Sequence, residues 1–313
     1  MTLALDPQVR EWYRPLIESK GFRLATRDVA ELRKAADEIY NDRDVRESIY
    51  ARGDISVPRG DGSELRLRVY RPDGNDGHPV LIYFHGGGFV IHNIESHDSL
   101  CRFLAKATGA VTVSVGYRLA PEHPYPAAQE DGAAALAWAL SEIGDSGGEP
   151  ERIVLGGDSA GASIAAGVAL MPGAGGINAL MLLYGDYGAV PYGESETVRA
   201  YADGSNVLPR EMLDFFHDLY VPEDADPRDP VLFPGRASDL SGMPPSFVVS
   251  AEYDPLRADG EAFAARMAES GAQVKSITAE GMMHGFALLY DKFDRAAELL
   301  RKLCADVREA TAG

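Results

Sequence analysis

A short apolar segment that leads into a glycine-flanked serine constrains this chain more than any other feature. Residues 153–155 are apolar and mostly β-branched, as expected for a strand buried on both faces. Two glycines then interrupt the segment, and the small residues from Ser159 onward indicate a helix. The sequence therefore predicts Ser159 at a strand-to-helix corner, with Gly157 and Gly161 letting the two backbones pass closely.

The same G-x-S-x-G pattern occurs a second time, at residues 144–148. Its letters, G-D-S-G-G, also resemble the nucleophile motif of chymotrypsin-like proteases, but that fold needs an all-β chain and an upstream histidine motif, which the sequence lacks. This copy follows a helical segment and precedes a strand, among loop-forming residues that end at Pro150. We therefore expect Ser146 to be a solvated loop residue, which leaves Ser159 as the candidate nucleophile.

The arrangement of apolar segments predicts an α/β fold with a parallel sheet. Continuous apolar segments occur at residues 80–84, 111–115, 153–155, 179–183 and 247–250, and helical patterns at 97–108, 127–143 and 159–170 separate most of them. Such alternation is typical of a parallel sheet covered by helices on both faces.

Both ends of this alternation carry further elements. Two strands at 52–57 and 65–70 are joined by a glycine turn, and the alternation of Leu65, Leu67 and Val69 with polar residues predicts a half-exposed antiparallel pair. A strand at 274–278 and a long amphipathic helix at 286–308 end the pattern. The sequence thus predicts eight strands, with Ser159 after the fifth.

Two regions are candidates for a small helical cap. Amphipathic helices are predicted at residues 6–19 and 28–41, before any strand, with Pro7 at the first helical position of the first of them. The segment 186–242 is too long for a simple crossover and contains an aromatic-rich helix at 209–221. We expect cap helices at 1–45 and a catalytic domain at 46–313, with a cap-contributing insertion at about 186–242.

Composition excludes several classes of partner. The 313 residues carry a formal net charge of −18, which argues against nucleic acid and anionic membranes as partners. The first residues show no signal-peptide pattern and no apolar run is long enough for a membrane span, so we expect a cytoplasmic protein. Cys101 and Cys304 are predicted to be reduced packing residues. No metal-ligand spacing or phosphate loop occurs, so no cofactor is expected.

An activated serine needs a base and a group that orients this base. His284 follows the eighth predicted strand, and Asp254 follows the seventh. The chain order Ser, Asp, His is that of α/β-hydrolases. Asp254 is the preferred orienting acid, but Glu252 and Asp259 lie close in sequence and remain alternatives.

Negative charge that develops on a reacting carbonyl needs hydrogen-bond donors. Three glycines, Gly86, Gly87 and Gly88, follow His85 at the end of the third strand, where free backbone N–H groups can face a ligand. We expect Gly86, Gly87 and Ala160 to form the oxyanion hole. The side chain of His85 is expected to brace this loop.

These motifs together resemble those of the hormone-sensitive-lipase-like esterases, also called bacterial family IV lipolytic esterases, of the α/β-hydrolase superfamily. The matching letters are H-G-G-G-F at 85–89, Y-R-L-A-P-E-H-P-Y-P-A-A at 117–128, G-D-S-A-G at 157–161, D-P-L-R at 254–257 and H-G-F at 284–286. Ala162, Ala258 and the absence of a proline after the sixth strand depart from the family pattern.

The resemblance implies an eight-stranded α/β-hydrolase with a helical cap that hydrolyses short-to-medium acyl carboxylic esters through an acyl-enzyme. It implies that Ser159, His284 and Asp254 form the catalytic triad and that the partner is a small-molecule ester. By analogy with relatives, a homodimer through the edge of the eighth strand is also expected. An amidase on the same triad, or a non-catalytic small-molecule receptor of the same fold, remains an alternative.

Overall fold

The computed structural model describes residues 4–18, 26–41, 47–204 and 206–312 of the chain. Its centre is one eight-stranded sheet with the order β1-β2-β4-β3-β5-β6-β7-β8. The strands are β1 (Ala51–Pro58), β2 (Glu64–Arg71), β3 (His78–Phe84), β4 (Val111–Gly116), β5 (Gly148–Asp158), β6 (Ile177–Leu183), β7 (Ser246–Tyr253) and β8 (Val274–Met283). Strand β2 is antiparallel to both of its neighbours, and β3 to β8 are mutually parallel. The predicted eight-stranded, mostly parallel sheet is confirmed.

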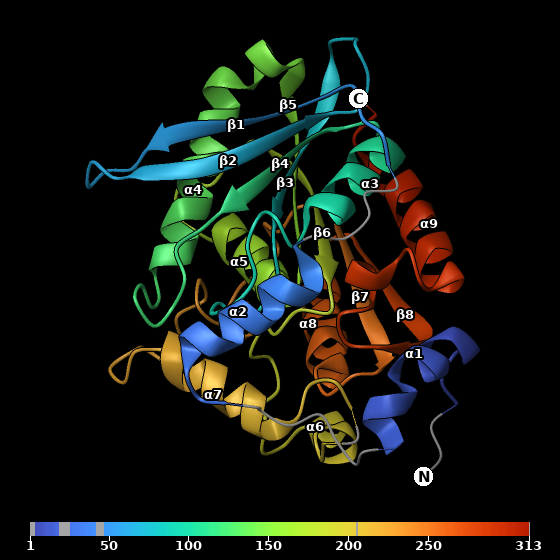
Figure 1. Cartoon of the computed structure of the whole chain (residues 1–313). Helices are drawn as coiled ribbons and strands as arrows, with labels where there is room; N and C mark the ends of the chain where they lie inside the picture. The colour runs from blue at the N-terminus through green and yellow to red at the C-terminus, as the bar shows by residue number, and fades with distance from the viewer. Residues whose placement is uncertain (1–3, 19–25, 42–46, 205, 313) are drawn as a thin grey trace.

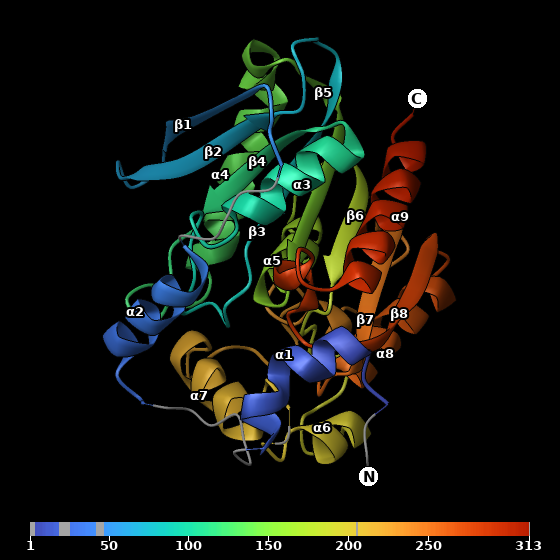
Figure 2. The same ribbon diagram turned by 45° about the vertical axis from the view of Figure 1, so that its right-hand side comes forward.

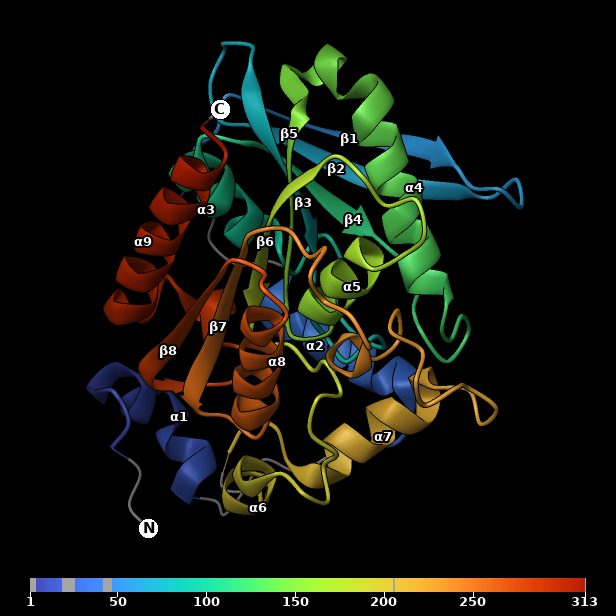
Figure 3. The same ribbon diagram turned by 180° about the vertical axis from the view of Figure 1, so that it is seen from behind.

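Helices cover both faces of this sheet, as the doubly buried strands require (Figures 2 and 3). One face is covered by α3 (Asp98–Thr108) and α9 (Asp294–Ala310), and the other by α4 (Ala127–Glu142), α5 (Ala160–Ala169) and α8 (Arg257–Glu269). The two faces have separate apolar clusters, one with Phe263 of α8 and one with Leu300 of α9. Cys101 and Cys304 are buried, unpaired thiols in α3 and α9, as predicted.

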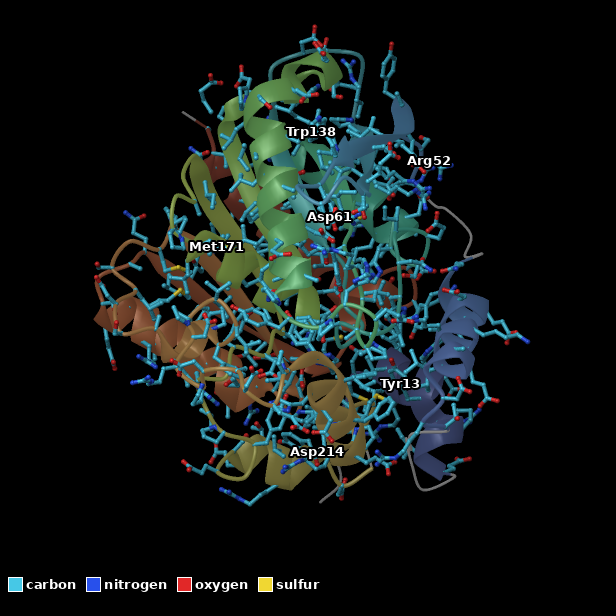
Figure 4. All side chains as sticks on the ribbon, turned by 90° about the vertical axis from the view of Figure 1, so that its left-hand side faces the viewer. Tyr13, Arg52, Asp61, Trp138, Met171 and Asp214 are labelled. Carbon is cyan, nitrogen blue, oxygen red and sulfur yellow. The ribbon has the colours of Figure 1, made fainter. Side chains whose placement is uncertain are left out.

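Four further helices lie together at the end of the sheet where the parallel strands terminate (Figure 1). They are α1 (Pro7–Glu18), α2 (Val29–Tyr40), α6 (Glu196–Tyr201) and α7 (Arg210–Tyr220). In Figure 4, Tyr13 of α1 and Asp214 of α7 lie at this end, and Trp138 of α4 lies toward the opposite end. The helices predicted at 6–19, 28–41 and 209–221 are confirmed within one residue at each described end, and Ser19 lies outside the described residues.

Two predictions about elements are wrong. The glycines after Leu155 do not end the fifth strand, because Gly156 and Gly157 pair with Met181 and Leu182 of β6. The last helix begins at Asp294, since residues 286–289 form a separate buried 3₁₀ turn. Short 3₁₀ turns also occupy Ile143–Ser146 and Pro234–Arg236.

The antiparallel pair β1–β2 is less exposed than its alternation predicts. Arg68 and Tyr70, on the face expected to meet solvent, are buried. The Tyr70 hydroxyl donates to Asp98 of α3 at 2.9 Å, and Arg68 forms ion pairs with Asp54 and Asp98. Helix α3 therefore covers this part of β2, and the buried arginine is neutralised by carboxylates.

Candidate active site

Ser159 occupies a strained corner between β5 and α5. Its φ of 52° and ψ of −123° lie in a region that side-chain-bearing residues rarely adopt. A Cβ atom at Gly161 would lie 1.9 Å from the carbonyl oxygen of Phe84, and one at Gly157 would lie 2.4 Å from Gly161. Glycines are therefore required on both sides of the serine, as the sequence predicted, because strand, helix and β3 meet here without room for side chains.

The ends of three strands bring Ser159, His284 and Asp254 together. His284 directly follows β8, and its Nε2 lies 2.9 Å from the Ser159 hydroxyl oxygen. Its Nδ1 lies 2.8 Å from Oδ2 of Asp254, which directly follows β7. The other Asp254 oxygen accepts a hydrogen bond from the N–H of Leu256 at 2.8 Å. The fully buried carboxylate is thus fixed by its own turn and faces the imidazole.

The alternative acids, Glu252 and Asp259, point elsewhere. Glu252 Oε2 accepts a hydrogen bond from the N–H of Gly281 at 2.7 Å. Asp259 accepts hydrogen bonds from the N–H groups of Tyr187 and Val190, at 2.6 and 2.8 Å. Glu252 therefore supports the end of β8 and Asp259 supports the segment after β6, and neither carboxylate hydrogen-bonds to the histidine.

The loop that follows β3, residues 86–93 and here called the glycine loop, runs beside Ser159. The N–H of Gly86 donates to the Asp158 carboxylate at 3.2 Å, and Gly86 does not contribute to the cavity wall. Gly87 and Gly88 do contribute to that wall, and their N–H groups donate to no acceptor within the described residues. Both have positive φ, at 120° and 59°. Gly86 is therefore a poor oxyanion donor, and Gly88 is the better candidate beside Gly87.

Asp158 hydrogen-bonds to the start of the glycine loop. Besides Gly86, its carboxylate accepts a hydrogen bond from the Tyr83 hydroxyl at 3.0 Å and contacts His97 Nε2 at 3.1 Å. Burial alone would raise the pKa of Asp158, but the contact with His97 and the hydrogen bond from Tyr83 together lower it. Asp158 thus forms structural hydrogen bonds beneath the glycine loop.

His85 braces the loop, as expected from the sequence. Its ring stacks on Tyr117 with the centroids 4.2 Å apart, and the Tyr117 hydroxyl donates to the His85 carbonyl oxygen at 2.7 Å. Burial lowers the pKa of the imidazole to about 3, so the ring is neutral near neutral pH. No charge from His85 reaches the reacting groups.

The chain is similar to proteins of a known fold family. Residues 81–288 match the alpha/beta hydrolase fold family, which is more than half of the chain. The chain belongs to this family. It is 38% identical over 256 residues to the carboxylesterase NlhH of Mycobacterium tuberculosis, covering 79% of each chain. It is 36% identical to the carboxylic ester hydrolase LipN of the same organism over 76% of this chain, and the match spans 64% of LipN.

A solved structure supports the same assignment. The esterase of Pyrobaculum calidifontis superposes with a TM-score of 0.89 at 33% identity, covering 98% of this chain and 100% of that one. Together with the five motifs, these matches make the chain a hormone-sensitive-lipase-like α/β-hydrolase. In α/β sheets, ligands bind at the carboxyl ends of the parallel strands, which is where Ser159 lies.

The α/β-hydrolase site opens into a cavity of about 480 Å³. Ser159, His284, Gly87 and Gly88 form part of its wall. Much of the apolar wall comes from three of the four helices beyond the sheet. It includes Trp12 and Tyr13 of α1, Leu32, Ala36 and Ile39 of α2, and Met212, Leu213, Phe216 and Tyr220 of α7. The apolar face of α2 thus meets the cavity, which explains why Ile39 is largely exposed to solvent.

The sequence could not decide which aromatic residues of α7 line a pocket. Phe216 and Tyr220 contribute to the cavity wall, but Phe215 does not; the guanidinium of Arg27 lies over its ring. A Cβ atom at Gly88 would lie 2.1 Å from the Phe216 ring, so α7 packs directly on the glycine loop. Among the described residues, no group of His, Cys, Asp and Glu side chains could hold a metal ion.

Proposed function

We propose that Ser159, His284 and Asp254 are the catalytic triad of this enzyme, and that Gly87, Gly88 and Ala160 form its oxyanion hole. The relatives are named as carboxylic ester hydrolases, and the chain is a serine carboxylesterase. The observation that carries the proposal is the continuous contact from Asp254 through His284 to the Ser159 hydroxyl at the cavity wall.

The proposed reaction is a two-step acyl transfer. The hydroxyl oxygen of Ser159 attacks the ester carbonyl while His284 Nε2 accepts the hydroxyl proton. Asp254 stabilises the imidazolium that forms. The negatively charged carbonyl oxygen accepts hydrogen bonds from the N–H groups of Gly87, Gly88 and Ala160. Each such donor is worth roughly 10²- to 10³-fold in rate. Ala160 is suited to this role because the first N–H of a helix has no intrahelical acceptor. The imidazolium then gives its proton to the ester oxygen, and the C–O bond breaks to release the alcohol and leave the acyl-enzyme. His284, neutral again, deprotonates a water that attacks the acyl-enzyme, which releases the acid and returns the proton to Ser159.

The proposed substrates are esters with short-to-medium acyl chains. A cavity of about 480 Å³ with mostly apolar walls is of the size that holds small organic ligands. In a series of 4-nitrophenyl esters from acetate to palmitate, kcat/KM should peak below about ten acyl carbons, because a longer chain exceeds such a cavity. A sharp optimum at longer chains would refute the assignment, and an amide with the same acyl group that reacts as fast as its ester would favour the amidase alternative.

The pKa of His284 predicts the acid limb of the pH profile. Burial alone would lower this pKa, but the Asp254 carboxylate, by charge and hydrogen bond, outweighs it and raises the pKa above the usual 6.5. A general base must be neutral, so kcat/KM should rise with pH through an apparent pKa above 6.5. A profile of kcat/KM between pH 5 and 9 checks this, and full activity retained below the usual histidine pKa would contradict it.

We also propose that α1, α2, α6 and α7 act as a cap, corresponding to residues 1–45 and about 186–242. The position of the four helices over the carboxyl ends of the strands supports this division, as does the share of the cavity wall that α1, α2 and α7 contribute. Two expectations from the sequence, a homodimer through the edge strand β8 and a cytoplasmic location, stay predictions. None of the helices described is both long and apolar enough to cross a membrane.

A further inference from the structure

Helix α2 contacts the glycine loop through its polar side as well as lining the cavity with its apolar side. Arg33 Nε donates to the carbonyl oxygen of Val90 at 2.9 Å. Asp37 Oδ1 accepts a hydrogen bond from Asn93 Nδ2 at 2.8 Å. The ring of Tyr40 meets the ring of His92 edge-on, with the centroids 5.0 Å apart. Three side chains spaced along one helix therefore hold three residues of the same loop.

One path of contacts leads from Arg33 to Gly87. The N–H of Val90, the residue whose carbonyl Arg33 binds, donates to the carbonyl oxygen of Gly87 at 3.0 Å. Arg33 Nη2 also donates to the carbonyl oxygen of Ala120 at 2.9 Å. The N–H of Ala120 in turn donates to the carbonyl oxygen of Phe89 at 2.9 Å. The guanidinium of Arg33 thus holds Val90 directly and Phe89 through Ala120, just after the proposed oxyanion donors.

The guanidinium is itself held in place. The Glu122 carboxylate accepts hydrogen bonds from Arg33 Nη1 and Nη2, at 2.8 and 2.7 Å. A two-point pair of this kind fixes the plane of the guanidinium, which a lysine ammonium cannot reproduce. The geometry of the Arg33 contacts therefore depends on the fork shape of the side chain as well as on its charge.

A second path leads from Tyr40 through His92 to the same glycine. A Cβ atom at Gly87 would lie 2.9 Å from Cδ2 of the His92 ring, so the ring is packed against this backbone. His92 has a φ of 68° and Phe89 one of 64°, both in the left-handed region that non-glycine residues avoid. Such conformations persist only where neighbouring groups enforce them. The contacts from α2 supply part of that enforcement.

We infer that Arg33 is a positioning residue for ester hydrolysis: its contacts from α2 hold the glycine loop so that Gly87 and Gly88 present their N–H groups to the oxyanion. The inference rests on the proposed function, because it assigns a support to the proposed donors. Arg33 is not in the cavity wall. Its loss should therefore weaken stabilisation of the transition state and leave substrate binding largely intact.

The test compares Arg33→Ala with Arg33→Lys and wild type. Misplacing an oxyanion donor by a fraction of an ångström costs less than deleting it, so Arg33→Ala should lower kcat about 10-fold, with KM within about twofold. Inhibition by a trifluoromethyl ketone, which forms a tetrahedral adduct, should weaken by the same factor. Arg33→Lys should give an intermediate loss of kcat, because an ammonium can reach one carbonyl but cannot make the whole set of contacts.

The adjacent residue on the helix provides a matched control. Lys34 is largely exposed, and its only ion pair within the part of the chain that the structure describes is with Glu38, at 4.0 Å. Lys34→Ala should therefore behave as wild type. If Arg33→Ala does not fold, as judged by its thermal unfolding, Arg33→Lys carries the test through its own loss of kcat.

Two results would overturn the inference. Unchanged kcat and inhibitor affinity in the Arg33 variants would show that the loop needs no support from α2. A rise in KM alone would show that the helix serves only as a cavity wall. Labelling of wild-type Ser159 by an organophosphonate separates this failure from that of the proposed function, since only the latter predicts no label.

Discussion

Replacing Ser159 with alanine should lower the rate of ester hydrolysis by about 10⁶-fold, the loss found when the nucleophile of a serine hydrolase is removed. The alanine leaves no oxygen within reach of His284 Nε2, which now lies 2.9 Å from the hydroxyl. Fold and cavity should persist, because the side chain makes no other hydrogen bond among the described residues. Turnover of 4-nitrophenyl butyrate, with the mass of the protein after organophosphonate treatment, measures both the rate and the site.

The chain provides a control with the same local sequence pattern. Ser146 is the central residue of the second G-x-S-x-G, but it ends a 3₁₀ turn before β5, whereas Ser159 follows the other end of that strand. Ser146→Ala should keep wild-type turnover and take up one label per chain. If Ser146→Ala lost activity while Ser159→Ala kept it, the assignment of the nucleophile would be wrong.

The corner and its partners could be predicted because their signals are local and ordered. A doubly buried strand must be apolar throughout, and close contact of strand and helix admits only glycine, so the residues around Ser159 specify a corner by themselves. Asp254 and His284 each follow directly on a strand. Parallel strands end at one edge of the sheet, and the sequence therefore brought the three residues to one place.

The proposed oxyanion donors could not be assigned from sequence because three successive glycines look alike. Only the conformation shows that the Gly86 N–H is used by Asp158, whereas Gly87 and Gly88 turn toward the cavity. One signal was present: Asp158 lies directly before Ser159, and a buried carboxylate requires hydrogen-bond donors. The sequence did not show that one of those donors would be the first glycine.

The contribution of α2 had no local signal at all. Arg33 and Val90 are 57 positions apart. From sequence alone, an arginine on an amphipathic helix that binds a distant loop cannot be told from one that is exposed to solvent. Arg68 presents the same difficulty on β2, where alternation predicted exposure but α3 covers the strand. In both cases the neighbour that decides burial comes from a distant part of the chain.

Asp254→Asn should lower kcat about 10⁴-fold, as the equivalent change does in serine proteases. The N–H of Leu256 fixes Oδ1 of the carboxylate, which leaves the other position of the side chain facing His284 Nδ1. In the variant this position is occupied by the side-chain NH₂ group of asparagine, which donates a hydrogen bond to Nδ1. The proton then resides on Nε2, and the imidazole can no longer accept the proton of Ser159.

The two acids left open by the sequence are the matched controls for this change. Glu252→Gln retains an oxygen for the N–H of Gly281, and Asp259→Asn retains one for Tyr187 or Val190. Neither side chain contacts His284, so both variants should stay within a fewfold of wild type in kcat. A loss in Glu252→Gln or Asp259→Asn as large as that in Asp254→Asn would mean that another carboxylate orients the base, and that the 2.8 Å contact between Asp254 and His284 is not the catalytic one.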